Sequence, residues 1–280
     1  MVATASRSQR WRVLRRSPTF WVGGLLVLMW VVFAIFGDFV TPYEPRGTPQ
    51  DILNRLQPPS AEHWFGTDDL GRDVLSRVLA GSRQVLTVAV SATILGTVLG
   101  TFIGLVIGYY GGFVDDVVSR VLDAFLSIPL VITGMLALAA LGPNTIGVIL
   151  VIGLVFTPII AKTVRAAVLS ERQLDYVTAA QLRKENSLYI MFVEILPNVW
   201  SIVIVEFTVR LGYAIFTVLA LSFLGFGVEP QTPDWGADIF QHYGQLTGRV
   251  WWPVLFPAMA IALLVIGVNL LADATSQAFE

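Results

Sequence analysis

Four stretches of this chain run for more than twenty residues without a charged side chain, and they limit the possible folds more than any other feature. They are residues 17–37, 85–110, 124–161 and 250–272. A helix needs about 20 apolar residues to cross the ~30 Å core of a bilayer, because each residue adds ~1.5 Å. Charged residues make up only 14% of the chain, whereas a soluble domain carries about 25%. The sequence therefore predicts an all-α membrane protein.

The longest uncharged run exceeds the length of one crossing. Gly142, Pro143 and Asn144 form a turn signal near its middle, so we divide it into two spans. Six transmembrane helices are predicted: residues 17–40, 85–110, 121–141, 145–161, 198–226 and 250–272. Around them lie a basic N-terminus (1–16), an outer loop (41–84), a polar loop (162–197), a second outer loop (227–249) and a short tail (273–280).

Positive charge predicts the orientation, because basic residues favour the cytoplasmic side of a membrane. A cluster of arginines precedes the first span: Arg7, Arg10, Arg12, Arg15 and Arg16. We expect a multi-pass protein of the cytoplasmic (inner) membrane with a cytoplasmic N-terminus. Six crossings then return the C-terminus and the polar loop to the same side. The first outer loop also carries arginines, which weakens this argument, although its acidic residues outnumber them.

A cleavable signal peptide is the alternative for the N-terminus. Residues 17–37 are longer than the usual apolar core of about 7–15 residues, and no clear small-residue cleavage site follows. An uncleaved first span is therefore favoured.

Two patterns stand out within the predicted spans. Gly96, Gly100, Gly104 and Gly108 recur every four residues, which predicts close packing against another helix; a helix that slides during gating would show the same pattern. Glu206 and Arg210 lie four residues apart in the fifth span. Charges at this depth are costly and usually pair inside the protein, so they either form a structural ion pair or line a transport pathway.

The sequence offers no catalytic constellation. It contains no phosphate-binding G-x-x-x-x-G-K-[ST] loop, no G-x-S-x-G elbow, no H-E-x-x-H pair and no cysteine. His63 and His242 fall in separate outer loops, where we expect solvated or hydrogen-bonded histidines rather than a metal site. Asp115, Asp116 and Asp123 are expected in a solvated loop or at a span boundary. A net charge of −2 gives no basic field for nucleic acid. We therefore predict a non-enzymatic chain that binds no cofactor or metal.

The polar segment 171–198, ERQLDYVTAAQLRKENSLYIMFVEILPN, lies between two apolar runs. Its Ala179-Ala180 pair and its Ile195-Leu196-Pro197 ending resemble the cytoplasmic "EAA" loop of ATP-binding-cassette importers. Through that loop a membrane subunit is driven by its ATPase partner.

A second segment, HWFGTDDLGRDVLSR at 63–77, resembles the HxxGTDxxGRDxxSR signature of peptide-type permeases. The "C" subunits of dipeptide, oligopeptide and nickel importers form this class. Segments 123–129, 221–227, 233–236 and 251–273 are similar to further parts of the family, so the resemblance runs from about residue 23 onward. The signature residues are Gly66, Thr67, Asp68, Gly71, Arg72, Asp73, Ser76 and Arg77.

The resemblance implies a type I importer permease fold that works beside a second, related permease. It further implies two cytoplasmic ATPases that bind ATP and Mg, surrounding membrane lipid, and an extracytoplasmic binding protein that docks on loops 41–84 and 227–249. Residues of a coupling helix would contact an ATPase: Asp175, Tyr176, Thr178, Ala179, Ala180, Gln181, Leu182, Arg183 and Lys184.

The resemblance favours di- or oligopeptides as the substrate. Nickel chelates, glutathione, haem and oligosaccharides remain alternatives within the class. A stand-alone secondary transporter or channel would need charged residues along its spans and no docking loop, and a scaffolding membrane protein is more remote.

The chain departs from the family pattern at two loop positions. Thr178 stands where the family has Glu, and Lys184 stands where it has Gly. A left-handed turn at Lys184 would cost an ordinary residue ~1–2 kcal/mol. Asn tolerates that conformation better, so we predict that Asn186 takes it and that the turn shifts by two residues.

Overall fold

The computed structural model describes residues 14–46, 49–142, 144–226 and 231–279. Within them every regular element is helical, and one isolated antiparallel bridge joins Thr67 to Asp73. The α-helices are α2 (Pro18–Val40), α3 (Val74–Tyr110), α4 (Gly112–Leu126), α5 (Leu130–Leu141), α6 (Thr145–Glu171), α7 (Asp175–Leu182), α8 (Ser187–Tyr189), α9 (Leu196–Phe223), α10 (Trp235–His242) and α11 (Trp252–Phe279). Shorter turns are the 3₁₀ helices η1 (Pro49–Asn54) and η3 (Tyr243–Gly248) and the π-helix η2 (Ile190–Ile195).

The described residues offer up to six crossings if one broken helix is counted as a span. Five helical runs in this part of the chain are long and apolar enough alone: Pro18–Gly37, Val74–Tyr110, Thr145–Glu171, Ser187–Phe223 and Trp252–Ala278. The all-α membrane fold is therefore confirmed.

The sixth crossing is the pair α4 and α5, which qualify only together and meet at an angle of 84°. The span predicted over residues 121–141 therefore begins earlier, at Gly112, and is broken in two. α4 ends with Ser127 as its C-cap and α5 begins after Pro129. The residue before a proline is pushed out of the helical conformation, which explains the break.

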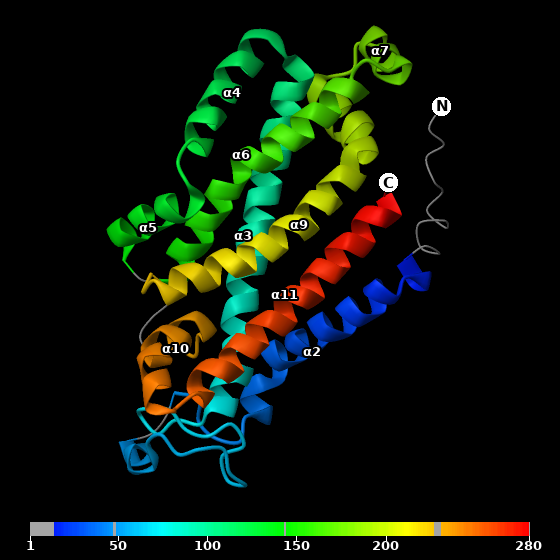
Figure 1. The fold of residues 1–280 in the computed structure, drawn as a ribbon. Helices are drawn as coiled ribbons and strands as arrows, with labels where there is room; N and C mark the ends of the chain where they lie inside the picture. Colours follow the sequence, from blue (N-terminus) through cyan, green and yellow to red (C-terminus); the bar gives the residue numbers. More distant parts are fainter. Residues whose placement is uncertain (1–13, 47–48, 143, 227–230, 280) are drawn as a thin grey trace.

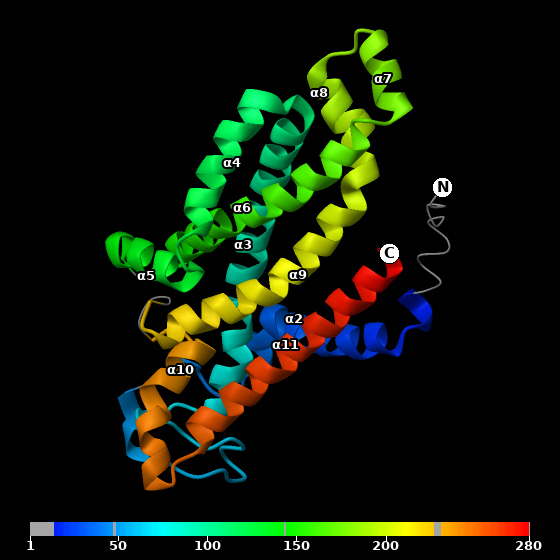
Figure 2. The same cartoon turned by 45° about the horizontal axis from the view of Figure 1, so that its top comes forward.

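α3 runs through the middle of the bundle (Figure 1). α2 and α11 pack side by side along one flank, and α4 and α5 lie on the other (Figure 2). α7 marks one end of the molecule, called the α7 end below, and α10 with loop 49–73 marks the α10 end. The first described turns of α2 and the last turns of α11 both lie toward the α7 end.

The glycine stripe of α3 packs against α6, as predicted. A Cβ atom at Gly100 would lie 2.7 Å from Ile160 Cβ, and one at Gly108 would lie 2.7 Å from Val168 Cβ. Only hydrogen fits at these positions. The stripe therefore brings the two backbones together along the length of the spans.

Two helices extend beyond the predicted spans. α3 begins at Val74 instead of near residue 85, because the Asp73 side chain accepts the backbone N–H of Ser76 at 2.8 Å and caps the helix. α6 continues to Glu171, ten residues past its predicted end at 161. The polar loop is consequently mostly helical.

Ion pairs hold α4 against α6. Asp115 is buried and binds Arg165, while Asp123 binds Lys162. The expectation of a solvated position was wrong for Asp115, because its partner Arg165 lies 50 residues later in the chain. Asp116 and Asp123 are exposed, but they lie in helix α4 rather than in a loop.

Candidate functional site

α7 presents one face to solvent and one to the protein. Its exposed residues are Asp175, Thr178, Ala179, Gln181 and Leu182. Val177 and Ala180 are fully buried and face η2, whose Ile190, Met191 and Ile195 are also buried. The small side chain of Ala180 thus serves packing within this chain. Ala179 and Leu182 are the apolar side chains that α7 exposes to solvent.

The turn after α7 is built around Lys184. The Lys184 N–H donates to Gln181 O at 2.9 Å and the Glu185 N–H donates to Ala180 O at 3.2 Å. These two bonds define a Schellman motif, in which the residue after the C-cap is left-handed. Lys184 occupies that position with φ 57°. The prediction that Asn186 is left-handed was wrong.

Asn186 has a different role, which explains the error. Its φ is −70°, and its side chain accepts the Leu188 N–H at 2.6 Å to cap α8. Nearby, Arg183 donates to the Glu194 carboxylate at 3.1 Å. The loop is thus a compact hairpin of helices with defined caps.

Tyr176 lies on the side of α7 that faces the membrane helices. Its hydroxyl donates to Glu171 Oε1 at 2.9 Å and accepts from Asn198 Nδ2 at 3.2 Å. Burial and the adjacent Glu171 carboxylate raise the pKa of Tyr176 well above its usual value. The phenol therefore keeps its proton.

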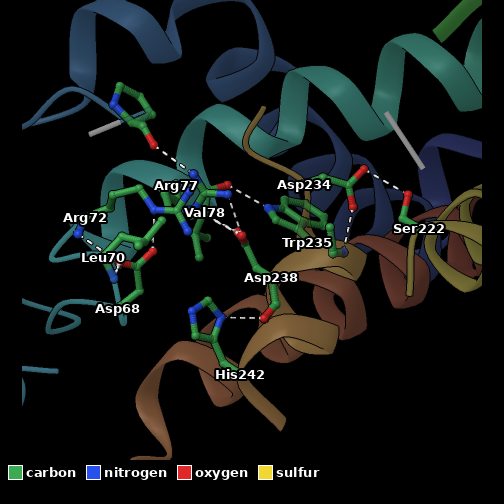
Figure 3. Close-up of polar contacts among 12 residues, drawn as sticks. Asp68, Leu70, Arg72, Arg77, Val78, Ser222, Asp234, Trp235, Asp238 and His242 are labelled. Atoms are coloured by element: carbon green, nitrogen blue, oxygen red, sulfur yellow. Dashed lines mark hydrogen bonds and ion pairs between the residues drawn. The ribbon is translucent and has the colours of Figure 1, made fainter. Parts of the chain in front are cut away.

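The signature residues form a folded unit at the α10 end (Figure 3). Asp68 accepts the backbone N–H groups of Leu70 and Arg72 at 2.9 Å and the Arg72 Nε–H at 2.6 Å. Gly66 and Gly71 have φ values of 74° and 79°, and a Cβ at Gly66 would lie 2.5 Å from Gln57 O. These contacts explain the glycines and the Asp–Arg spacing of the motif.

The signature is also hydrogen-bonded to the loop that precedes it and to the first turn of α3. Thr67 Oγ1 accepts the Gln57 N–H at 2.8 Å and donates to Asn54 O at 2.5 Å. Asp73 accepts from the Ser76 hydroxyl at 2.8 Å, while its other oxygen lies 2.9 Å from His63 Nδ1. The signature therefore anchors the loop before it as well as the start of α3.

Arg77 connects the signature to α10. Its Nε–H donates to Asp238 Oδ1 at 3.1 Å, and its Nη1 donates to Pro45 O at 3.0 Å. The Arg77 and Asp238 side chains are each 4% exposed. A buried pair of this kind needs both partners, because removal of one leaves an uncompensated charge.

α10 is held by two further buried contacts, shown in Figure 3. Asp234 caps the helix by accepting the Ala237 N–H at 3.0 Å, and it accepts the Ser222 hydroxyl at 2.9 Å. The Trp235 indole N–H donates to Val78 O at 2.9 Å. Burial raises the pKa of Asp234 above its ordinary value. The segment 233–236 resembled the family in sequence, but its partners on α3 and α9 were not predicted.

Both histidines are hydrogen-bonded, and His242 is buried rather than solvated. His242 Nδ1 lies 2.6 Å from Asp238 O and its Nε2 lies 2.9 Å from Asp69 Oδ1. Asp68, Asp69 and His242 have ligand atoms within 4.8 Å of one another. Because Arg72 already pairs with the Asp68 carboxylate, this group is better suited to ion pairing than to a cation.

Glu206 and Arg210 contact each other through Arg210 Nε and Glu206 Oε2 at 2.9 Å, and the Arg210 guanidinium lies 5.4 Å from the Tyr213 ring centre. Beside them a groove of about 350 Å³ between α9 and α11 is lined in part by Tyr213, Asn269 and Asp273. Polar side chains at this depth indicate a face turned to protein or water rather than to lipid.

A larger cavity of about 730 Å³ opens at the α10 end. Residues 41–46 form one wall, and Ala80, Arg83, Gln84 and Thr87 form another along α3. Thr232 and Pro233 close a third side. The cavity thus lies where the two predicted outer loops meet.

The membrane bundle, the exposed loop helix and the folded signature define a multi-pass membrane permease. Residues 96–280 match the family described as the inner membrane component of binding-protein-dependent transport systems, and residues 7–59 match the N-terminal transmembrane domain of oligopeptide transport permease C. The chain belongs to this family of transport permeases, which confirms the resemblance inferred from its motifs.

Curated relatives match nearly the whole chain. The di/tripeptide transport system permease protein DppC of Pseudomonas aeruginosa is 36% identical over 266 residues, covering 92% of this chain and 87% of that protein. The dipeptide transport system permease protein DppC of Escherichia coli K12 is 39% identical over 276 residues, covering 96% and 91%. The glutathione transport system permease protein GsiD of Salmonella typhimurium is 38% identical over 271 residues, covering 96% and 88%.

Proposed function

We propose that this chain is a non-catalytic subunit of an ATP-driven importer and forms half of the pathway for di- or oligopeptides. Relatives named for di/tripeptide and dipeptide transport support the substrate class. The observation that carries the energy coupling is α7, a short helix with an exposed face on a loop that connects two membrane helices. ATP and Mg are bound by partner chains.

The α7 end faces the cytoplasm in this proposal. Arg15 and Arg16 precede α2, whose start lies toward that end, and basic residues favour the inner side. Arg7, Arg10 and Arg12 lie outside the described residues. The C-terminal turns of α11 share the α7 end, so both termini are cytoplasmic and the protein resides in the inner membrane.

The exposed face of α7, with Lys184 at its C-terminal turn, docks in a groove of a cytoplasmic ATPase. ATP-driven closure of two such ATPases displaces α7, and α6 and α9 tilt with it because they are joined to its loop. The pathway then opens toward the α10 end. Hydrolysis resets the helices.

An extracytoplasmic binding protein docks at the α10 end, over the cavity between residues 41–46 and 232–233. The rigid signature beneath that cavity supports this assignment, since a docking surface must keep its shape. A second, related permease covers the face with Glu206 and Arg210, and together the two subunits enclose the pathway in the lipid bilayer.

Glutathione is the second candidate substrate, because a glutathione permease is 38% identical over most of this chain. Glutathione is itself a small peptide, so one pathway suits both. Nickel chelates, haem and oligosaccharides remain further alternatives, and a stand-alone secondary transporter is the most remote one.

Photo-crosslinking from α7 tests the coupling. The chain has no cysteine, so Leu182→Cys gives one labelling site in this subunit. Leu182 is 80% exposed, whereas Ala180 is 0% exposed and unsuitable. In inside-out vesicles, a crosslinker at residue 182 should capture an ATPase, identified by mass spectrometry, with a yield that changes on adding ATP and vanadate.

Leu246→Cys, on an exposed turn at the α10 end, is the matched control and should capture no ATPase. Failure of Leu182→Cys to capture an ATPase in the assembled complex would overturn the coupling proposal. The substrate is tested separately by uptake of labelled dialanine into proteoliposomes containing the complete complex, with glutathione as competitor.

A further inference from the structure

One tyrosine joins α7 to the ends of two membrane helices. The Tyr176 hydroxyl donates to Glu171 Oε1 on the last turn of α6 at 2.9 Å. It accepts from Asn198 Nδ2 on the first turn of α9 at 3.2 Å. The hydroxyl oxygen of Tyr176 therefore links α6 and α9, the two helices that the α7 loop connects.

The connection to α9 lies beside a weak point of that helix. η2 has the wider π-helical turn, and Pro197 follows it without a backbone N–H to donate. Helices bend at π-turns and at prolines. Asn198 Nδ2 also donates to Glu194 O within η2 at 2.8 Å, so Asn198 connects Tyr176 to the chain on both sides of Pro197.

We propose that Tyr176 is a positioning residue that makes α6 and α9 move together when α7 is displaced. It acts through Glu171 and Asn198 and not by contact with a partner, because its hydroxyl is engaged within this chain. The inference rests on the proposed role of α7 in energy coupling.

Loss of the Tyr176 hydroxyl changes which part of the loop bends when α7 is displaced. With the link present, a push on α7 reaches α6 and α9 together. Without it, η2 bends beside Pro197 and absorbs the movement before it reaches α9. ATP hydrolysis then continues, but less of it is converted into transport.

The link is independent of pH over the physiological range. The raised pKa of Tyr176 keeps its hydroxyl protonated, so it remains able to donate to Glu171. A glutamine can replace Glu171 in this contact, because its amide oxygen accepts the same hydrogen bond from the Tyr176 hydroxyl.

Tyr176→Phe tests the proposal because it removes only the hydroxyl and keeps the packed ring. The complete complex is reconstituted in proteoliposomes, and labelled dialanine taken up is divided by ATP hydrolysed. We expect this ratio to fall about tenfold, the scale of losing one or two hydrogen bonds, with ATP hydrolysis largely retained. Glu171→Gln should keep the ratio close to that of the unmodified complex.

Tyr189→Phe is the matched control. Tyr189 lies in the same loop and is 40% exposed, and its hydroxyl makes no hydrogen bond to the described part of the chain. Its substitution should leave the ratio unchanged. An unchanged ratio in Tyr176→Phe would overturn the proposal, as would an equal loss in Tyr189→Phe.

A distance measurement separates this inference from the proposed function. Spin labels at Leu182→Cys on α7 and Trp200→Cys on α9, both exposed, report the α7–α9 distance in the complex. We expect one narrow distribution that shifts with ATP and vanadate, and a broadened one in Tyr176→Phe. If the unmodified complex fails to carry dialanine, the peptide assignment fails, and the distance distributions still decide whether Tyr176 links the helices; identical distributions overturn the link.

Discussion

Lys184 holds a backbone conformation that glycine adopts without strain. Its φ of 57° closes the Schellman turn after α7, and a left-handed non-glycine residue costs ~1–2 kcal/mol. The cost is tolerated because the two backbone hydrogen bonds of the turn and the cap at Asn186 fix the hairpin. Strain of this kind is a common feature of functional segments, which agrees with the proposed role of the α7 loop.

Lys184→Gly should stabilise the α7 turn by up to about 1 kcal/mol, because relief of ~1–2 kcal/mol of strain exceeds the ~0.4–1 kcal/mol lost to a freer unfolded chain. Hydrogen exchange followed by mass spectrometry should show slower exchange over residues 178–185. Arg183→Gly is the control: its φ is −71°, so glycine relieves no strain there and should speed exchange. Faster exchange in Lys184→Gly would contradict this account.

α3 and α6 share the most extensive helix contact in the described part of the chain. At the four glycines α3 contributes no side-chain atoms to this contact, so its backbone approaches α6 more closely than larger residues permit. The sliding role considered from the sequence would need space that this contact lacks. The pair therefore provides a fixed frame against which α4, α5 and α9 are placed.

Gly100→Ala should destabilise the protein by about 1–3 kcal/mol, the usual cost of overpacking. The added Cβ would lie 2.7 Å from Ile160 Cβ and 2.9 Å from Thr157 O, which forces the helices apart. Gly24→Ala on α2 is the matched control, because its nearest atom would be 3.9 Å away. Apparent melting temperatures in detergent measure both, and equal values would refute close packing as the role of the stripe.

The positions of the membrane helices could be predicted from the sequence, but the break in one of them and some of their ion pairs could not. Uncharged runs located the crossings because bilayer solvation depends on local composition. The bend at Pro129 was missed because no charge interrupts that run. Asp115 was misplaced because its partner Arg165 on α6 is remote in sequence.

In the candidate sites too, features set by the local sequence were predictable, whereas contacts between distant segments were not. The exposed helix α7 was predicted from local motifs, since a short polar segment between apolar runs must face water. The left-handed residue was assigned wrongly because Asn186 prefers to cap α8, a competition between two local roles of one side chain. The partners of Tyr176 and of Arg77 depend on the tertiary fold and no local pattern contains them.

Across the whole molecule, the two ends are held by different forces. Buried ion pairs and capped turns fix the α10 end through Arg77, Asp238 and Asp234. The α7 end is held by the buried apolar contact of α7 with η2, by hydrogen bonds around Tyr176 and by ion pairs of the exposed Arg183. We infer that displacement is concentrated at the α7 end while the α10 end keeps its shape.

The pH dependence of overall stability follows from Asp234. Its pKa is raised by burial above the ordinary value of 3.8, so the folded state binds the proton more tightly than the unfolded state. The stabilising effect of protonation is complete below the ordinary pKa and is lost as pH rises through the raised value. An asparagine side chain at this position cannot ionise, yet its amide oxygen can accept the Ala237 N–H and its amide N–H can donate to the Ser222 hydroxyl.

Asp234→Asn should therefore flatten the fall in apparent melting temperature that begins as pH rises above the ordinary carboxyl value of 3.8. Glu62→Gln, at an exposed outer carboxylate, should leave the profile unchanged. A profile in Asp234→Asn as steep as that of the unmodified protein would contradict a buried, titrating Asp234.

The Arg77–Asp238 pair also bears on how the chain is made. These residues are 161 positions apart, so at about 5–20 residues per second Arg77 is synthesised roughly 8–32 s before its partner. During that interval the arginine has no carboxylate from α10, although the other contacts of the signature lie within residues 54–76. Only a chain translated through α10 can complete this pair, so a prematurely terminated product would leave Arg77 without Asp238.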